Sequence, residues 1–181
     1  ALPGLTFTDA FFETMSGLST TGATVLVGVD HLPPSLNLWR HALNWYGGMG
    51  IIVLVVAILP LLGVGGMQVY KAETPGPMKD EKLTPRITQT AKALWFVYFL
   101  ITVACTVSLR WAGMGWFDAI CHAFAALALG GFSTYDASVG HFDSPAIEAV
   151  LIVFMLIAAM NFSRHFIAWQ QKSLRTYRED V

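Results

Sequence analysis

Long apolar runs separated by polar segments predict an all-α membrane protein. Residues 42–64 contain no charged side chain, residues 93–109 lie between Lys92 and Arg110, and residues 146–162 form a third apolar run. A helix needs roughly 17–25 apolar residues to cross a bilayer, so each run is long enough to span it. Lys92 and Arg110 can extend their charged ends toward the two membrane surfaces. The pattern therefore predicts three spanning helices in a lipid bilayer.

Two shorter amphipathic runs predict helices that enter the membrane only part-way. Residues 6–18 and 116–128 each reach about 20 Å at ~1.5 Å per residue, less than a hydrocarbon core of ~30 Å. Thr6 with Asp9 three residues later resembles a capping box, which favours a helix start at this point. Asp118 lies in the first turn of the second run, where an acidic residue is also favourable.

The two short helices belong to a repeat with a spacing of 109 residues and no gap. Each copy continues into a glycine-centred segment, which we name loop 1 (residues 19–24) and loop 2 (residues 128–134). A short helix, a glycine loop and a long helix that occur twice predict one repeated structural unit. The matching pairs include Phe7 with Trp116, Asp9 with Asp118, Gly22 with Gly131, and Thr24 with Ser133.

Basic residues set the predicted orientation. Nine of the eleven Lys and Arg residues lie within residues 71–92 and 164–178, and the exceptions are Arg40 and Arg110. By the positive-inside rule those two segments face the cytoplasm, so both loops enter from the opposite, outer side. The outer segments are acidic, which would raise the local concentration of cations. This acidic mouth comprises Asp9, Asp30, Asp118, Asp136 and Asp143, with Glu13 just inside it.

These boundaries divide the chain into four regions. Turn-rich outer returns are expected at residues 25–41 and 135–145, and a polar connection at residues 70–92. The regions are residues 1–66 with the first short helix, loop 1 and a spanning helix; residues 67–92 as a cytoplasmic loop; residues 93–168 as a complete second unit; and residues 169–181 as a cytoplasmic tail.

The composition excludes several classes of function. The chain is 55% hydrophobic and 13% charged, with a mean hydropathy of +0.55, and a soluble domain usually carries about twice that charged fraction. A net charge of −1 gives no footprint for nucleic acid. Cys105 and Cys121 lie in apolar stretches and are expected to be small buried residues. No Ser/His/Asp or HExxH pattern is present, so neither an enzyme nor a cofactor is expected.

Loops 1 and 2 suit a monovalent cation bound by backbone carbonyl oxygens. Non-helical backbone at membrane depth is tolerated only beside protein or a water-filled path. Gly22 and Gly131 permit backbone angles that turn consecutive carbonyls to one side. Such carbonyls can replace the hydration shell of an ion, and the partly negative ends of the two short helices point the same way. The loops are therefore predicted to form a selectivity filter.

Side chains near the loops have secondary expected roles. Leu129 stands where Thr20 does, so hydroxyl groups are not common to both loops. Thr24 and Ser133 are expected to brace the loops by hydrogen bonds. His122 is expected to brace its own short helix, and Asn161 to face the inner pore or a neighbouring helix.

A secondary transporter that binds a small solute at broken helices is the alternative interpretation. That class uses inverted repeats, whereas the repeat predicted here is parallel because both loops enter from the same side. A membrane scaffold without transport would not explain the repeated glycine loops. The sequence leaves open whether ion movement is passive or coupled to H⁺ or Na⁺.

Several stretches also carry a family resemblance. They are FTDAFFETMSGLSTTGAT, NWYGGMGIIVLVVAILPLLGVGGMQ, KAETPGPMKDEKLTPRI and FDAICHAF followed by LGGFSTYDASVGHFDS. Together they closely resemble the Trk/Ktr/HKT superfamily of potassium transporters, over nearly the whole chain. The family fold places four repeats of helix, pore helix, filter loop and helix around one pore with pseudo-fourfold symmetry. The resemblance implies that this chain holds the first repeat without its opening helix, followed by the complete second repeat.

The resemblance also implies the site and the partners. It implies potassium uptake across the bacterial inner membrane, with K⁺ as the transported ion, a homodimer of the full-length chain, and a cytoplasmic nucleotide-binding regulatory subunit of the TrkA type. Two loops cannot close a four-sided filter, so this stretch alone is not expected to conduct. The loops lack the TVGYG sequence of potassium channels, so looser selectivity is expected. The implied filter residues are Thr20, Thr21, Gly22, Ala23, Leu129, Gly130, Gly131 and Phe132.

Overall fold

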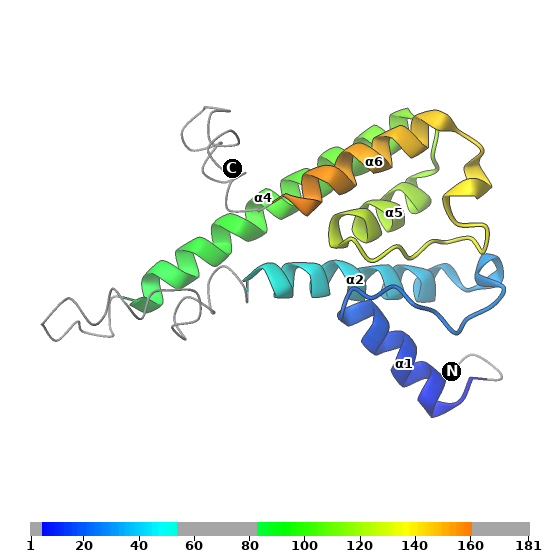
Figure 1. Ribbon diagram of the computed structural model, residues 1–181, viewed down its shortest axis with the longest axis horizontal. Helices are drawn as coiled ribbons and strands as arrows, with labels where there is room; N and C mark the ends of the chain where they lie inside the picture. The colour runs from blue at the N-terminus through cyan, green and yellow to red at the C-terminus, as the bar shows by residue number, and fades with distance from the viewer. Residues whose placement is uncertain (1–4, 54–82, 161–181) are drawn as a thin grey trace, which may run out of the picture. The chain divides into compact units, whose positions relative to one another are not determined.

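The computed structural model of the protein describes residues 5–53 and 83–160, and all regular structure within these ranges is helical (Figure 1). One compact unit comprises residues 1–49 and 99–160, and a second comprises residues 50–98 and 161–181. The first unit contains both loops. The longer helices are α1 (Phe7–Leu18), α2 (Pro34–Val53), α4 (Leu83–Trp111), α5 (Trp116–Ala128) and α6 (Pro145–Ala159), and the short 3₁₀ helices are η1 (Val29–His31) and η5 (Ser138–Phe142).

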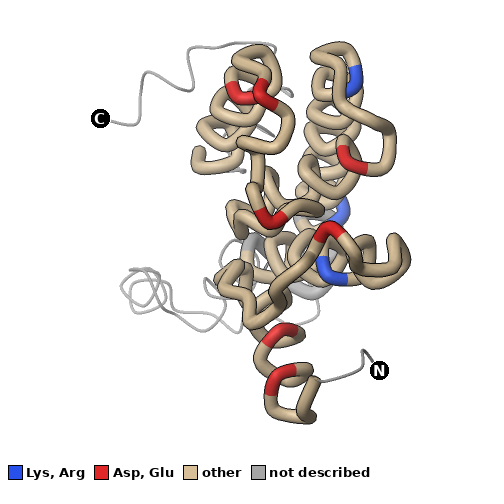
Figure 2. The backbone as a smooth tube through the Cα atoms, turned by 90° about the vertical axis from the view of Figure 1, so that its right-hand side faces the viewer, with Lys and Arg blue, Asp and Glu red and all other residues tan. Residues whose placement is uncertain are grey.

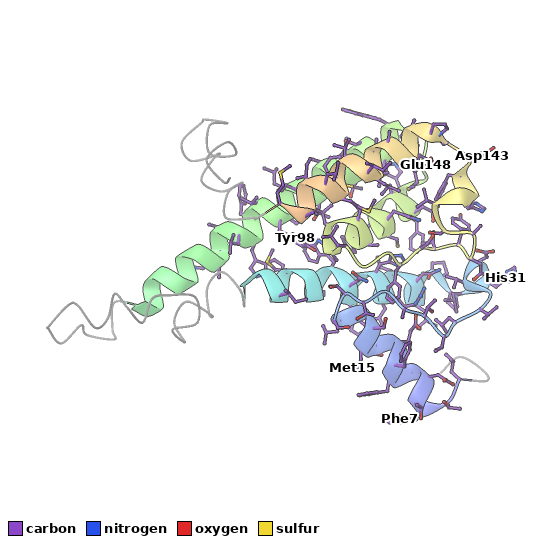
Figure 3. All side chains as sticks on the ribbon, in the orientation of Figure 1. Phe7, Met15, His31, Tyr98, Asp143 and Glu148 are labelled. Atoms are coloured by element: carbon purple, nitrogen blue, oxygen red, sulfur yellow. The ribbon has the colours of Figure 1, made fainter. Side chains whose placement is uncertain are left out.

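The two short helices form where the sequence predicts them. The capping box at the start of α1 is confirmed: the Asp9 carboxylate accepts from the Thr6 amide at 3.0 Å and from its hydroxyl at 2.7 Å, and the Asp9 amide donates to the Thr6 hydroxyl at 3.2 Å. These hydrogen bonds from Thr6 lower the pKa of Asp9. Apolar side chains of α1 such as Phe7 and Met15 extend into open space (Figure 3).

Helix α2 begins earlier than predicted. The sequence placed an outer loop over residues 25–41, but the helix starts at Pro34, eight residues ahead of the predicted start at 42. A proline fits the first turn of a helix because its missing N–H has no intrahelical partner there. The error has a physical cause: the first turns of α2 carry polar residues, Asn37 and Arg40, which are buried against loop 1 and the rest of the site rather than solvated.

Helix α4 also begins earlier, at Leu83 rather than at residue 93. The last ten positions of the predicted polar connection over residues 70–92 are therefore helical, and their cytoplasmic location stays a prediction. Within α4, residues 91–111 are long and apolar enough to cross a membrane, and this is the one such span among the described helices. Helix α6 is described to Ala159, and the predicted role of Asn161 lies outside the described residues.

The core of the first unit is built around α5. This helix packs against α6 and lies between α6 and α2 in Figure 1. Trp45 of α2 stacks on Phe124 of α5 with ring centroids 5.1 Å apart, and its Nε1–H donates to the Thr102 hydroxyl of α4 at 3.0 Å. Cys105 and Cys121 are free and buried, as predicted. The core therefore fixes α5, and with it the start of loop 2.

Candidate functional site

Loops 1 and 2 follow the same backbone path. Thr20 and its counterpart Leu129 have φ values of 57° and 55°, and Gly22 and Gly131 have φ values of 72° and 80°. Left-handed angles are costly for residues with a side chain, so their recurrence at Thr20 and Leu129 marks a constrained turn. The 109-residue repeat predicted from sequence thus extends to the sign of individual backbone angles.

The hydrogen bonds that end the two short helices are repeated as well. The Thr20 amide donates to Gly17 at 3.0 Å, and the equivalent Leu129 amide donates to Ala126 at 3.2 Å. The next amide in each loop donates to a carbonyl one residue further back, with 3.0 Å for both Thr21 to Ser16 and Gly130 to Ala125. Both helices therefore end with their partly negative carbonyl end at the loop that follows.

The two loops touch at Gly22 and Gly130. A Cβ atom added to Gly22 would overlap the backbone carbonyl of Gly130, whereas a Cβ added to Gly131 would meet nothing within 4 Å. The two glycines share a backbone conformation but not an environment. Gly22 is needed for close approach and for its positive φ, whereas the structure requires Gly131 only for its positive φ.

Loop 1 is held from behind by a buried ion pair. Glu13 of α1 accepts from the Thr24 hydroxyl at 2.9 and 3.0 Å and from the Val25 amide at 3.2 Å. Arg40 of α2 approaches the same carboxylate with an N–O distance of 2.7 Å, and the two side chains are 7% and 9% exposed. Glu13 was predicted to lie just inside the acidic mouth; the structure shows that its carboxylate is buried and paired with Arg40 rather than exposed to solvent.

Loop 2 is held by a counterpart of this arrangement in which a histidine takes the place of the glutamate. His122 Nε2 lies 3.0 Å from the Ser133 hydroxyl, while its Nδ1 lies 2.8 Å from the Asp118 carbonyl. The Ser133 hydroxyl also accepts from the Tyr135 amide at 3.2 Å, as the Thr24 hydroxyl accepts from the Leu26 amide at 3.1 Å. His122 thus contacts the loop in addition to its own helix.

Asp118 has a larger role than its predicted place at a helix start. Its carboxylate accepts from the Thr134 hydroxyl at 2.7 Å and from the Tyr135 hydroxyl at 3.4 Å. Burial, together with the negative charge of Asp118, raises the pKa of Tyr135, so this hydroxyl stays protonated and can donate. Asp9, the counterpart of Asp118, instead caps its own helix.

Glu13 and His122 occupy equivalent positions of the repeat, 109 residues apart. Each lies eleven residues before the hydroxyl that it contacts, Thr24 or Ser133. This pair was not predicted from the sequence, because a carboxylate and an imidazole are chemically different groups. The signal was available in the alignment of the two copies, which places a hydrogen-bonding side chain at the same point of both short helices.

The side chain of Phe132 anchors loop 2 to the first repeat. Its ring lies under the Arg40 guanidinium at 4.5 Å and edge-on to His41 at 6.1 Å between centroids. A Cβ on Gly17 of α1 would be 3.3 Å from the same ring, so a glycine there leaves room for Phe132. Loop 2 is therefore positioned by α1 and α2 as well as by its own repeat.

The backbone of Gly130 is covered by Asn44 of α2. The Asn44 side chain is fully buried, and neither atom of its amide has a hydrogen-bond partner among the described residues. A Cβ at Gly130 would overlap this amide, which explains the small residue at a position without a positive φ. Beside loop 2, a cavity of about 310 Å³ opens between Gly131, His122 and α6.

The outer returns of the two copies are joined to each other. The Asp136 carboxylate accepts from the Val29 amide at 3.1 Å, and the Asp136 amide donates to the Asp30 carboxylate at 2.9 Å. Acidic residues outnumber basic ones among the described residues (Figure 2).

Within residues 5–53 and 83–160, no group of three His, Cys, Asp or Glu side chains could hold a metal ion.

Comparison with known proteins places the chain among cation transporters. A family model described as TrkH, cation transport protein, matches residues 2–180. The chain is 59% identical to the Trk system potassium uptake protein TrkH of Escherichia coli strain K12, over 98% of this chain and 37% of that protein. It is 48% identical to the Trk system potassium uptake protein TrkG of the same strain, over 98% of this chain and 36% of that protein.

A solved structure gives the same result. The crystal structure of the potassium transporter TrkH from Vibrio parahaemolyticus matches with a TM-score of 0.84 and 51% sequence identity, covering 98% of this chain and 35% of that one. The chain thus spans little more than a third of the length of the relatives that it matches.

Proposed function

The chain belongs to the TrkH family of cation transport proteins, and from this premise we propose that it supplies two of the filter loops of a potassium-uptake pathway. The predicted fold class, an all-α membrane protein of repeated pore-helix units, is confirmed by the likeness to a solved potassium transporter. The observation that carries the proposal is the shared path of the loops, in which left-handed turns recur at Thr20 and Leu129 and at Gly22 and Gly131.

The proposed ion ligands are the backbone carbonyls of the two loops. A repeated turn at the carbonyl end of a short helix presents oxygen atoms to a cation without needing matched side chains. This suits loops whose side chains differ, as Thr20 and Leu129 do. One carbonyl of loop 1 is already engaged, because Ala23 accepts from the Ser16 hydroxyl at 2.6 Å, and its second lone pair remains for an ion.

The braces of the two loops belong to the same proposal. Thr24 and Ser133 each bond a residue of the preceding short helix and an amide two residues further along the chain. A hydroxyl fixed at both sides limits how far the loop can relax around a smaller cation. The proposed role of Thr24 and Ser133 is therefore to preserve the spacing of the carbonyls.

The wider setting follows the family. We place the loops at the periplasmic side of a bacterial inner membrane, the region of residues 67–92 and the tail of residues 169–181 in the cytoplasm, and the full-length chain in a homodimer with a TrkA-type regulatory subunit. The names of the relatives refer to a Trk system, which supports additional components. The secondary-transporter alternative is disfavoured because the two loops repeat in parallel rather than in inverted order.

The first test is rubidium uptake by a full-length protein that contains this sequence, in cells without their own potassium-uptake systems. Potassium should compete with rubidium better than sodium does, and Gly131→Ser should reduce that preference because a side chain at φ 80° strains loop 2. Ser138→Ala in η5 serves as the matched control, with an unchanged cation preference. If Gly131→Ser is made in normal amounts and ranks the cations as the wild type does, the carbonyl-filter proposal is wrong.

A further inference from the structure

Among the described residues, Arg40 is the one charged side chain that contacts both loops. It and Glu13 are the buried Arg and Glu of residues 5–53 and 91–160, and the other described Asp, Glu, Lys and Arg side chains there are more exposed. A buried charge is retained only where it is paired and its hydrogen-bonding capacity is used. The contacts of Arg40 therefore need to be accounted for one by one.

The guanidinium of Arg40 is oriented by three side chains of the first repeat. Its Nε donates to Glu13 at 2.8 Å, one terminal nitrogen donates to Asn37 at 3.1 Å, and the other contacts Glu13 at 2.7 Å and Thr24 at 3.3 Å. A planar fork with fixed donors holds its partners in a defined geometry, which a single ammonium group does not. Arg40 thus fixes both Glu13 and the Thr24 hydroxyl behind loop 1.

The face of the same guanidinium contacts the second repeat. Its central carbon lies 4.5 Å from the centre of the Phe132 ring, within the range of a cation–π interaction. Phe132 is 4% exposed and belongs to loop 2, so the contact is desolvated. One cation therefore contacts loop 1 through hydrogen bonds and loop 2 through an aromatic ring.

The second repeat has no equivalent of this cation. The residue that matches Arg40 at the 109-residue spacing is Ala149, and the residue that matches Glu13 is the histidine His122. Within its own repeat, loop 2 is held by hydrogen bonds from Ser133 to His122 and from Thr134 to Asp118, but its position relative to loop 1 depends on contacts between the two repeats. The remaining direct contact described between the loops is the approach of Gly22 to Gly130.

We propose that Arg40 is a positioning residue of the ion filter, which sets the distance between loops 1 and 2 and thereby the order in which cations are preferred. This inference rests on the proposed function, since it assigns to Arg40 the spacing of carbonyls that the filter uses. Arg40 contacts no ion: it acts through Glu13 and Thr24 on one side and through Phe132 on the other.

The test compares cation preference, not only uptake, in a full-length protein that contains this sequence. Arg40→Lys keeps the charge but loses the fork, and Phe132→Leu keeps the backbone carbonyl and the apolar character but loses the ring. Both should lower the preference for potassium over sodium, measured by competition with rubidium, by roughly tenfold, or about 1.4 kcal/mol. Arg110→Gln is the matched control, because that exposed arginine on α4 should leave the preference unchanged.

Charge removal provides a second arm. Arg40→Gln alone leaves Glu13 buried without its partner and should reduce the amount of protein in the membrane. Adding Glu13→Gln should restore that amount but not the cation preference, because the fork and its contact with Phe132 are still missing. A purely structural role for Arg40 would instead have the double variant recover both.

The outcomes separate this inference from the proposed function. If Gly131→Ser alters the cation preference while Arg40→Lys and Phe132→Leu leave it at the wild-type value, the filter stands and the role of Arg40 is refuted. If Gly131→Ser has no effect either, the filter itself fails. If every variant at Arg40 and Phe132 is lost from the membrane, the contacts are needed for folding and the positioning role is rejected.

Discussion

Single residues in the loops show that one backbone conformation can serve two different needs. Gly22 and Gly131 both have a positive φ, which the repeat in the sequence predicted. Only the structure shows that Gly22 also lies against the carbonyl of Gly130, since contacts between loops cannot be read from spacing alone. Equivalent glycines are therefore expected to differ in their tolerance of a methyl group.

Gly22→Ala is predicted to be more damaging than Gly131→Ala. Both changes place a side chain in the left-handed region, which costs roughly 1–2 kcal/mol. Gly22→Ala adds an overlap with a backbone atom that cannot rotate away, whereas Gly131→Ala meets open space. Purified full-length variants should show a lower thermal stability for Gly22→Ala than for Gly131→Ala. Equal losses of stability would mean that the approach of the loops is not limiting.

Helices and their ends were predicted with uneven success, and the reasons are physical. The bounds of α1 and α5 follow from local signals, the capping box at Thr6 and the glycine loops that end both helices. The starts of α2 and α4 were missed because a helix does not stop where its residues become polar. In α2 those polar residues, Asn37 and Arg40, are buried against the site. Their low hydropathy predicted an exposed loop, although they are buried residues of the helix that contact the site.

Two glycines of α2 test how closely the end of α1 packs against this helix. A Cβ at Gly47 would overlap the carbonyl of Leu18, the last residue of α1, whereas Gly50 has nothing within 4 Å in the described part of the chain. Gly47→Ala should lower the stability of the full-length protein by about 1–3 kcal/mol through overpacking. Gly50→Ala should be neutral or stabilising by up to about 1 kcal/mol, because alanine favours a helix. Thermal unfolding in detergent would distinguish them, and a destabilised Gly50→Ala with an unaffected Gly47→Ala would contradict this packing.

For the whole molecule, the distribution of charge predicts the direction of insertion. The acidic residues of the outer returns are described, and two of them, Asp30 and Asp136, join the returns of the two copies. The basic residues that set the orientation lie mostly outside the described residues. The orientation in the membrane is therefore predicted from the sequence, and the described part of the fold does not test it.

Labelling of single cysteines would test this orientation. Val27, in the first outer return, is 95% exposed, so Val27→Cys should react with a membrane-impermeant maleimide added to the periplasmic side. Lys79→Cys, in the predicted cytoplasmic loop, should react only after the membrane is permeabilised. The native cysteines Cys105 and Cys121 are buried and should contribute little background. The reverse pattern of labelling would overturn the proposed topology.

The unlike supports of the two loops have a consequence for the symmetry of the pathway. The Thr24 hydroxyl of loop 1 bonds a carboxylate that is paired with a guanidinium, whereas the equivalent Ser133 hydroxyl of loop 2 bonds an imidazole, although the two loops share their left-handed turns. A duplicated segment invites the assumption that its copies are interchangeable, so that a result obtained on one can be transferred to the other. Here the two copies share backbone angles but are supported by different side chains, so a result measured on one loop does not transfer to the other.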